Sequence, residues 1–293
     1  MRLGGLRESG NVEDRRGIGL GRGGMAVGGG CGTVIVVILA LVFGVDPSQF
    51  LGGGGGVGPA EGPAPASRPG GAPGQPAPGA DEDARFIRRV LGTTEDTWND
   101  IFRRNGSDYR EPKLELFSGQ TNSACGRAGA SVGPFYCPAD EKIYIDLTFY
   151  DELQNRFRAP GDFAQAYVIA HEVGHHVQNL LGTSDKVTNL QRRARSEAQS
   201  NDLSVRLELQ ADCYAGVWGF YAKQRNILDP GDLEEALGAA AAIGDDRLPR
   251  QTQGYAVPDS FTHGSSEQRA RWFRLGFDSG DVRRCDTFSA RSL

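Results

Sequence analysis

Two histidines and a glutamate lie together in one short motif, His-Glu-x-x-His, formed by His171, Glu172 and His175. Residues four apart lie on one face of a helix, so the rings of His171 and His175 can bind one tetrahedral metal ion. Glu172 can then reach a water molecule on that metal and act as general base. The pattern is typical of zinc hydrolases. The alternative is a chance arrangement on the surface, although the chain has only four histidines in all.

A third ligand is expected from Glu208, on the edge of the apolar stripe of a later helix, with Asp212 one turn further on. Two like charges four residues apart repel each other unless something neutralises them. If Glu208 binds zinc and Asp212 accepts the second ring N–H of a ligand histidine, both carboxylates have partners. Two solvated acids are the alternative interpretation.

His263 is the one histidine of the sequence outside residues 171–176. It could complete a three-histidine site, but that choice leaves Glu208 and Asp212 unexplained, so we predict one Zn²⁺ per chain on His171, His175 and Glu208. His263 precedes a helix and could instead donate a hydrogen bond to a tetrahedral oxyanion, supported by Arg269. A loop histidine without chemistry is the alternative.

Four cysteines fall in the later part of the chain, without the short spacings of metal fingers: Cys125, Cys137, Cys213 and Cys285. Two disulfides in an oxidising compartment are therefore expected, with four reduced cysteines in a cytosolic protein as the alternative. The sequence allows three connectivities. We favour Cys125 with Cys137, which flank a turn-rich loop, and Cys213 with Cys285.

The early part of the chain differs in composition from the rest. Residues 26–45 are uncharged and apolar enough to span a bilayer as a single helix. Arginines before them predict that 1–25 is cytoplasmic and that the later domain lies outside. A signal peptide is disfavoured because no Ala-x-Ala site follows closely. Residues 46–82, rich in Gly, Pro and Ala, predict a disordered linker, and 83–293 one globular domain. The first 30 residues are also expected to be unstructured.

The formal net charge of −5 and the absence of a basic run with aromatic residues give no support for a nucleic-acid partner. The expected partners are a peptide or protein substrate and, through residues 26–45, a membrane.

Periodicity predicts the elements that hold these residues. Two short helices are expected at 83–91 and 94–102, then strands at 114–117, 134–137 and 142–150. The last of these strands could be an edge on which an extended peptide adds, and an ordinary core strand is an equal alternative.

The helix of the motif should begin at Asp162, with Gln165 at capping-box spacing, and end at Gly182. Further helices are expected at 203–223 and 232–243, and a last one after a capping box of Ser265 and Gln268.

Several segments resemble one family. His-Glu-Val-Gly-His-His at 171–176, Arg-Leu-Glu-Leu-Gln-Ala-Asp-Cys at 206–213 and Pro-Asp-Ser-Phe-Thr-His-Gly-Ser-Ser at 258–266 are similar to motifs of the YpfJ-type neutral zinc metallopeptidases of bacteria. Ser-Ala-Cys-Gly at 123–126 and Gly-Pro-Phe-Tyr-Cys-Pro at 133–138 belong to the same resemblance. More distantly, the chain resembles HtpX-like and CAAX prenyl protease peptidases.

The resemblance implies zinc on His171, His175 and Glu208, with Glu172 as base. It also implies that Asp212 supports a ligand from behind, and that His263 and Arg269 lie near the substrate. Gly264 follows His263 where the distant group has proline, which leaves the orientation of His263 open.

The expected fold is therefore α+β, a zincin-like and mainly helical domain with a small sheet on the cleft, behind one N-terminal transmembrane helix. The expected function is that of a zinc metallopeptidase, an endopeptidase anchored in the cytoplasmic membrane of a bacterium with its domain in the periplasm. The alternative is a membrane-tethered assembly or binding factor that keeps zinc as a structural clamp. Structural sites usually close all four positions with Cys and His, whereas three ligands beside Glu172 leave one position open.

Overall fold

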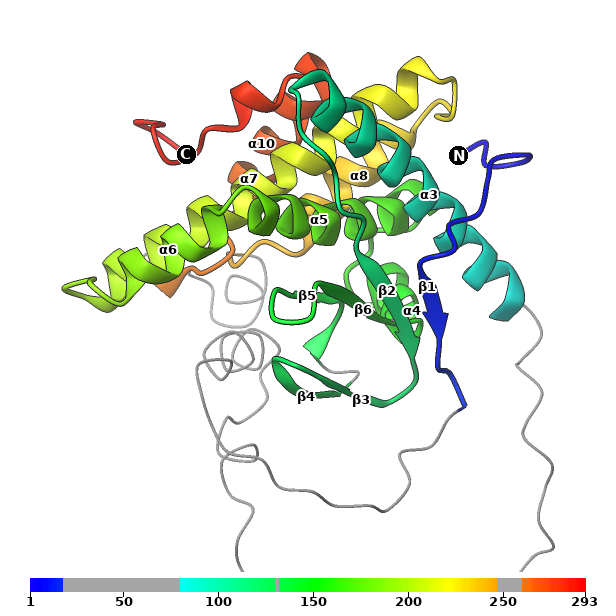
Figure 1. Cartoon of the computed structure of the whole chain (residues 1–293), viewed down its shortest axis with the longest axis horizontal. Coiled ribbons are helices and arrows are strands. Elements are labelled where there is room, and N and C mark those ends of the chain that lie inside the picture. The colour runs from blue at the N-terminus through cyan, green and yellow to red at the C-terminus, as the bar shows by residue number, and fades with distance from the viewer. Residues whose placement is uncertain (18–79, 130–131, 247–259) are drawn as a thin grey trace, which may run out of the picture.

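The computed structural model describes residues 1–17, 80–129, 132–246 and 260–293 (Figure 1). The transmembrane helix expected at 26–45 and nearly all of the expected linker lie outside these residues. Within the described ranges, no helix is both long and apolar enough to cross a bilayer.

The described chain forms a mainly helical α+β domain with a small mixed sheet. This agrees with the expected α+β class and with the expected small sheet. Its helices are α3 (Ala80–Arg104), α4 (Thr148–Asn155), α5 (Asp162–Leu180), α6 (Thr183–Gln191), α7 (Glu197–Gln224), α8 (Asp232–Ala242), α10 (Ser266–Ser279) and the 3-10 helix η3 (Val282–Cys285). Its strands are β1 (Val12–Asp14), β2 (Lys113–Phe117), β3 (Gln120–Ser123), β4 (Gly126–Gly129), β5 (Phe135–Cys137) and β6 (Lys142–Asp146).

The strands form a four-stranded sheet of order β1-β2-β6-β5 and a separate hairpin of β3 and β4. β1, β2 and β6 are parallel, and β5 is antiparallel to β6. In Figure 1 most helices gather on one side of the molecule, and α5 lies between them and the sheet. The helix of the motif is therefore held from both sides.

β6 ends at Asp146, earlier than the strand expected at 142–150. The Asp146 carboxylate accepts hydrogen bonds from the backbone N–H and the hydroxyl of Thr148, at 3.0 and 2.9 Å, and this turn starts α4. β6 also lies between β2 and β5, so an added peptide cannot pair with it. The expectation of an edge strand there is wrong, and the alternative of a core strand is confirmed.

One continuous helix, α3, replaces the two helices expected at 83–91 and 94–102. A second helix that begins at residue 94 would use Thr93 or Thr94 as its N-cap. Instead the Thr93 hydroxyl donates to the carbonyl oxygen of Val90 at 2.6 Å, and Thr94 makes the same kind of bond at 2.7 Å. Threonines that bond back along the helix in this way are compatible with a helix interior.

Residues 1–17 pack on the domain, contrary to the expectation that the first 30 residues are unstructured. β1 pairs with β2, with Val12 opposite Leu114, and the side chain of Leu3 is buried. The segment has few apolar residues, so periodicity gave no sign of a strand. Polar contacts to α3 hold it, such as the hydrogen bond of 2.5 Å from Ser9 to the buried carboxylate of Glu95.

α5 begins and ends close to the predicted residues. Its N-cap is Gly161, with a φ of 117°, and no side chain caps the helix, so the expected capping box of Asp162 and Gln165 is wrong. The Asp162 carboxylate instead accepts a hydrogen bond of 2.7 Å from the α-amine of Met1. Gly182, with a φ of 73°, follows the end of α5 as expected.

The polar stretch after Gly182 contains α6 and the first turns of α7, which the weak apolar pattern did not predict. α7 begins at Glu197, six residues before the expected start at 203, because Ser196 caps it by accepting from the N–H of Gln199 at 3.2 Å. The capping box of Ser265 and Gln268 at α10 is confirmed, with both bonds present.

α7 and α10 approach so closely that neither has room for a side chain at the contact. A Cβ added at Gly216 would overlap the carbonyl oxygen of Phe273, and one at Gly276 would overlap that of Cys213. The absence of side chains lets the backbones touch. This contact carries Arg269, near the start of α10, to the face of α7 that holds Asp212.

Candidate metal centre

α5 and α7 cross at the centre of the motif. A Cβ on Gly174 would lie 2.9 Å from the carbonyl oxygen and 3.0 Å from the Cα of Ala211, so glycine is what lets the backbone of α7 lie directly against α5. Glu208 and Asp212 lie on either side of Ala211 along α7. The close crossing therefore aims both carboxylates at the histidines of α5.

Three side chains converge as a ligand set. One ligand atom each of His171, His175 and Glu208 lies within 4.8 Å of the others. The Nε2 atoms of His171 and His175 lie 3.1 and 3.4 Å from the two carboxylate oxygens of Glu208. Two imidazole nitrogens and one carboxylate oxygen, with a free fourth position, are the donor set of a catalytic zinc ion. The structure thus brings together the three residues predicted to bind zinc.

Charge favours a cation at this point. Burial alone would raise the pKa of Glu208, but the two histidines hold it well below its usual value. Burial alone would lower the pKa of His171, but Asp212 and Glu208 raise it to about 9. A metal that binds the Nε2 of His171 displaces a proton, so metal binding releases protons.

Asp212 supports His171 from the side away from the ligand set, as predicted. Its fully buried carboxylate accepts a hydrogen bond of 2.8 Å from the Nδ1 of His171. A carboxylate only accepts, so Nδ1 carries the proton and Nε2 points to the ligand set. Burial opposes the charge of Asp212, but Arg269 and His171 hold its pKa below the usual value.

Arg269 binds the carboxylate of Asp212. Its guanidinium makes two bonds to the Asp212 carboxylate, at 2.8 and 2.9 Å, and is itself buried. The hydroxyl of Tyr167 donates to the same carboxylate at 2.5 Å. We expected Arg269 to support His263 near the substrate. The structure instead places it behind His171, where it neutralises Asp212.

His175 is supported by uncharged amides. Its Nδ1 lies 2.9 Å from the side-chain oxygen of Gln178, whose own N–H group donates to the carbonyl oxygen of Leu207 at 2.7 Å. This second bond orients the amide so that its oxygen accepts from His175. Gln178 also donates to Gln210 at 3.2 Å, and Gln210 donates to the carbonyl oxygen of Cys285 at 2.9 Å.

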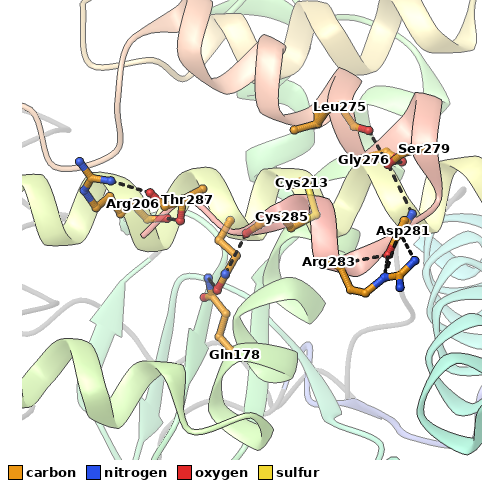
Figure 2. Close-up of a disulfide and its surroundings, with 11 residues drawn as sticks. Gln178, Arg206, Cys213, Leu275, Gly276, Ser279, Asp281, Arg283, Cys285 and Thr287 are labelled. Carbon is orange, nitrogen blue, oxygen red and sulfur yellow. Dashed lines mark hydrogen bonds and ion pairs between the residues drawn. A yellow bond between two sulfur atoms is a disulfide. The ribbon is translucent and has the colours of Figure 1, made fainter. Parts of the chain in front are cut away.

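The far end of this chain of hydrogen bonds is tied to α7 by a disulfide. Figure 2 shows the Cys213–Cys285 bond beside α7, with Gln178 extending toward it from α5. Nearby, the Thr287 hydroxyl donates to the carbonyl oxygen of Arg206 at 2.7 Å and so helps fix the C-terminal segment. The other disulfide joins Cys125 to Cys137. Both favoured pairings are confirmed.

Glu172 lies beside the ligand set and is buried. Burial raises the pKa of its carboxyl group, although the neighbouring histidines partly oppose this. A carboxylate whose pKa is raised toward neutrality is a better general base. The position and environment of Glu172 fit the predicted role.

His263 is held by Asp245, a residue that the sequence did not suggest. The Nδ1 of His263 lies 3.1 Å from one oxygen of Asp245, and the other oxygen accepts backbone N–H bonds from Thr262, His263 and Gly264 at 2.6, 2.6 and 3.2 Å. Gly264 has a φ of 92°, which proline cannot adopt. Proline therefore could not replace Gly264 in this conformation.

His263 also lies close enough to the ligand set to interact with it electrostatically. Burial opposes its protonation, but Asp245 and Glu208 raise its pKa above the usual value. Its Nε2 is not used by Asp245. The hydroxyl of Thr262, 3.0 Å away, also contacts its Nδ1, so the ring is held on that side.

His176 faces away from the ligand set, as its helical position predicts. It is fully buried between the hydroxyl of Tyr136, 3.0 Å from its Nδ1, and the carbonyl oxygen of Arg110, 2.5 Å from its Nε2. It is a core histidine that ties α5 to the sheet.

Sequence reasoning missed four residues that orient the site, namely Tyr167, Gln178, Asp245 and Gln210. Tyr167 and Gln178 lie one helical turn from a ligand histidine, so helical spacing could have suggested them. Asp245 is 18 residues from His263, and no pattern connects the two.

An HExxH helix that takes a third ligand from a second helix defines a class of zinc-dependent peptidases. The chain belongs to the family described as "Putative neutral zinc metallopeptidase", whose model matches residues 1–288. This confirms the family resemblance of the motifs.

Two relatives illustrate the similarity. The chain is 51% identical over 305 residues to "Uncharacterized protein YpfJ" of Escherichia coli (strain K12), an alignment that covers 98% of this chain and 99% of that protein. It is 45% identical over 226 residues to "Uncharacterized protein Rv2575" of Mycobacterium tuberculosis (strain ATCC 25618 / H37Rv), covering 73% and 75%. No solved structure matches the chain.

Proposed function

We propose that this protein is a zincin-like endopeptidase that hydrolyses peptide bonds with one zinc ion held by His171, His175 and Glu208. The observation that carries the proposal is the convergence of these three ligand atoms within 4.8 Å, with Glu172 buried beside them. Peptide bonds suit such a site because one positioned carboxyl group can take a proton from the attacking water and then give it to the poor leaving group.

A bound zinc ion supplies Lewis acidity, which acidifies a water molecule and polarises a carbonyl oxygen. The protein supplies the rest. Glu172 accepts the proton of the attacking water and delivers it to the nitrogen of the leaving amine. His263, oriented by Asp245 at 3.1 Å, donates a hydrogen bond to the oxyanion that forms. No covalent intermediate with the protein is required.

The two disulfides support an oxidising compartment as the place of action, because such bonds persist mainly in secreted, periplasmic or surface domains. A peptide or protein outside the cytoplasm is then the proposed substrate. Attachment to the membrane through residues 26–45 remains a prediction from sequence.

The test compares zinc content and peptide-library cleavage for the full chain, purified in detergent, and three variants. Glu172→Gln should keep about one zinc per chain and lose roughly 10²–10⁴-fold in kcat. Glu208→Ala should lose zinc and activity together. His263→Ala should keep zinc and lose about 10²-fold or more in kcat, with KM little changed.

Three outcomes would reject parts of this proposal. A parent chain that binds zinc but cleaves no peptide would favour the alternative of a structural zinc clamp. Loss of zinc from Glu172→Gln would make that residue a ligand. Zinc retained without Glu208 and lost without His263 would exchange their roles.

A further inference from the structure

The α-amine of Met1 lies in a cluster of carboxylates that is separate from the metal centre. It is 2.7 Å from Asp162, 3.4 Å from Asp229 and 3.6 Å from Asp232. Asp162 is the first residue of α5, Asp232 is the first residue of α8, and Asp229 lies in the turn before α8. The amine therefore joins the starts of two helices.

The surroundings match the chemistry of an ammonium group. Carboxylates at helix N-termini are stabilised by the helix dipole, but several together repel one another. The ammonium of Met1 supplies the opposite charge and three donors. Partial burial opposes the charge of the amine, but its hydrogen bond and its attraction to Asp162 raise its pKa above the usual value.

Contacts continue along the segment that follows. The backbone N–H of Arg2 donates to the carbonyl oxygen of Ile227 at 2.7 Å, and that of Ser9 donates to the carbonyl oxygen of Arg88 at 2.9 Å. A Cβ at Gly92 would lie 3.0 Å from the carbonyl oxygen of the segment's Arg7, so α3 has a glycine where the segment crosses it.

Glu95 on α3 shows that the domain is built to receive this segment. Its carboxylate is 1% exposed and binds the hydroxyl of Ser9, the amide of Asn11 and the guanidinium of Arg7, at 2.5, 2.9 and 2.8 Å. All three partners come from residues 1–17. A buried carboxylate that loses its partners is strongly destabilising, so the fold depends on the segment.

We propose that Asp162, Asp229 and Asp232 form a binding site for the free α-amine of Met1, which makes residues 1–17 a structural part of the domain. The site requires that Met1 is retained and carries no formyl or acetyl group. Such a group removes the charge and the donors, and an added residue displaces the ammonium from the carboxylates.

One consequence concerns topology. Residues 1–17 and the domain contact each other, so they lie on the same side of any membrane. With a single crossing at 26–45, residues 1–25 and the domain would instead lie on opposite sides of the membrane.

The test blocks the amine and asks whether the effect depends on the carboxylates. The full chain is produced in bacteria with and without a deformylase inhibitor, and mass spectrometry identifies formyl-Met1. We expect formylation to lower Tm by about 2–4 °C and to speed hydrogen exchange in residues 1–17 by about tenfold. In the Asp162→Asn variant, formylation should lower Tm by less than half of the loss seen in the parent chain.

Asp185→Asn is the matched control, because Asp185 also lies in the first turn of a helix, α6. Formylation should lower its Tm as much as that of the parent. Asp229→Asn, which removes another carboxylate of the same cluster, replaces Asp162→Asn if that variant does not fold. Equal Tm for free and formylated parent chains, or an equal loss in every background, would overturn the proposal.

A labelling experiment tests the topology. Gly10 and Gly238 are exposed, and a Cβ at either meets no atom within 4 Å, so Gly10→Cys and Gly238→Cys give two matched sites in a Cys31→Ser chain. A membrane-impermeant maleimide applied to intact cells should label both sites or neither. Labelling of one site alone would show that the segment does not dock in the cell.

Discussion

The two ligand histidines of α5 are supported by different chemistry. Behind His171 lies a fully buried charged cluster, in which Asp212 receives bonds from the imidazole, from Arg269 and from Tyr167. Behind His175 lie the uncharged amides of Gln178 and Gln210, which lead to backbone carbonyl oxygens.

The difference separates two effects on a metal ligand, namely its orientation and its basicity. A carboxylate fixes the tautomer of His171 and also raises the basicity of its other nitrogen, whereas a neutral amide fixes only orientation. The charged side is also more sensitive, because removal of one partner leaves a buried charge uncompensated. Substitutions in the charged cluster behind His171 should therefore have larger effects than substitutions in the amides behind His175.

Arg269→Leu should produce the largest effect, because it leaves Asp212 buried without its main counter-charge. We expect a loss of about 3–5 kcal/mol in the free energy of unfolding, measured by chemical denaturation. Arg274→Leu, which removes a half-exposed arginine paired with Asp278 on the same helix, should change it by less than about 0.5 kcal/mol. Similar losses in both variants would contradict the importance of the charged cluster.

The double variant Cys213→Ser/Cys285→Ser removes the disulfide that fixes Cys285, whose carbonyl oxygen accepts from Gln210 behind His175. Because that disulfide spans 72 residues, its loss should lower the unfolding free energy by about 4 kcal/mol, against about 3 for the pair Cys125 and Cys137, which spans 12. The first variant should also weaken zinc affinity, since the Cys285 carbonyl holds Gln210. Competition with a chelator measures this, and an equal weakening by loss of the other disulfide would exclude the connection.

Asp212→Asn removes the negative charge behind His171 with almost no change in the size of the side chain. Zinc affinity should fall by about 10–100-fold, because the imidazole of His171 loses a charged acceptor and Arg269 loses its counter-charge. Chelator competition at constant pH measures the change. An unaltered affinity would mean that the position of His171 is set by packing alone.

Gln178→Leu should have the smallest effect, about tenfold or less in zinc affinity, because a neutral acceptor contributes orientation alone. The same chelator series applies, with Asn179→Leu as a control on the same helix. If Gln178→Leu weakens zinc binding more than Asp212→Asn does, the comparison between the two sides is wrong.

Local patterns predicted the parts of the site that depend on one element. Helical spacing aligned His171 with His175. The repulsion between Glu208 and Asp212 indicated that each carboxylate needs a partner, and the structure confirms the ligand histidine predicted for Asp212, at 2.8 Å. The cysteine pairing followed from the loop between Cys125 and Cys137.

The missed contacts join residues that are distant in sequence. Arg269 reaches Asp212 because Gly216 and Gly276 let two helices touch, and neither glycine has a periodic signal of its own. Glu95 gave no sign of its partners near the N-terminus, 84–88 residues away, because polar contacts leave no apolar pattern.

The docked N-terminus has a consequence for the order of folding. Residues 1–17 are synthesised before the rest of the domain, but the contact of Met1 with Asp162 spans 161 residues, and the last carboxylate of its site is at position 232. At about 5–20 residues per second, translation reaches that point only after roughly 10–50 s. Contacts so distant in sequence form late. Residues 1–17 are therefore among the last to reach their native positions, and until then the carboxylates of Glu95, Asp162 and Asp232 lack these partners.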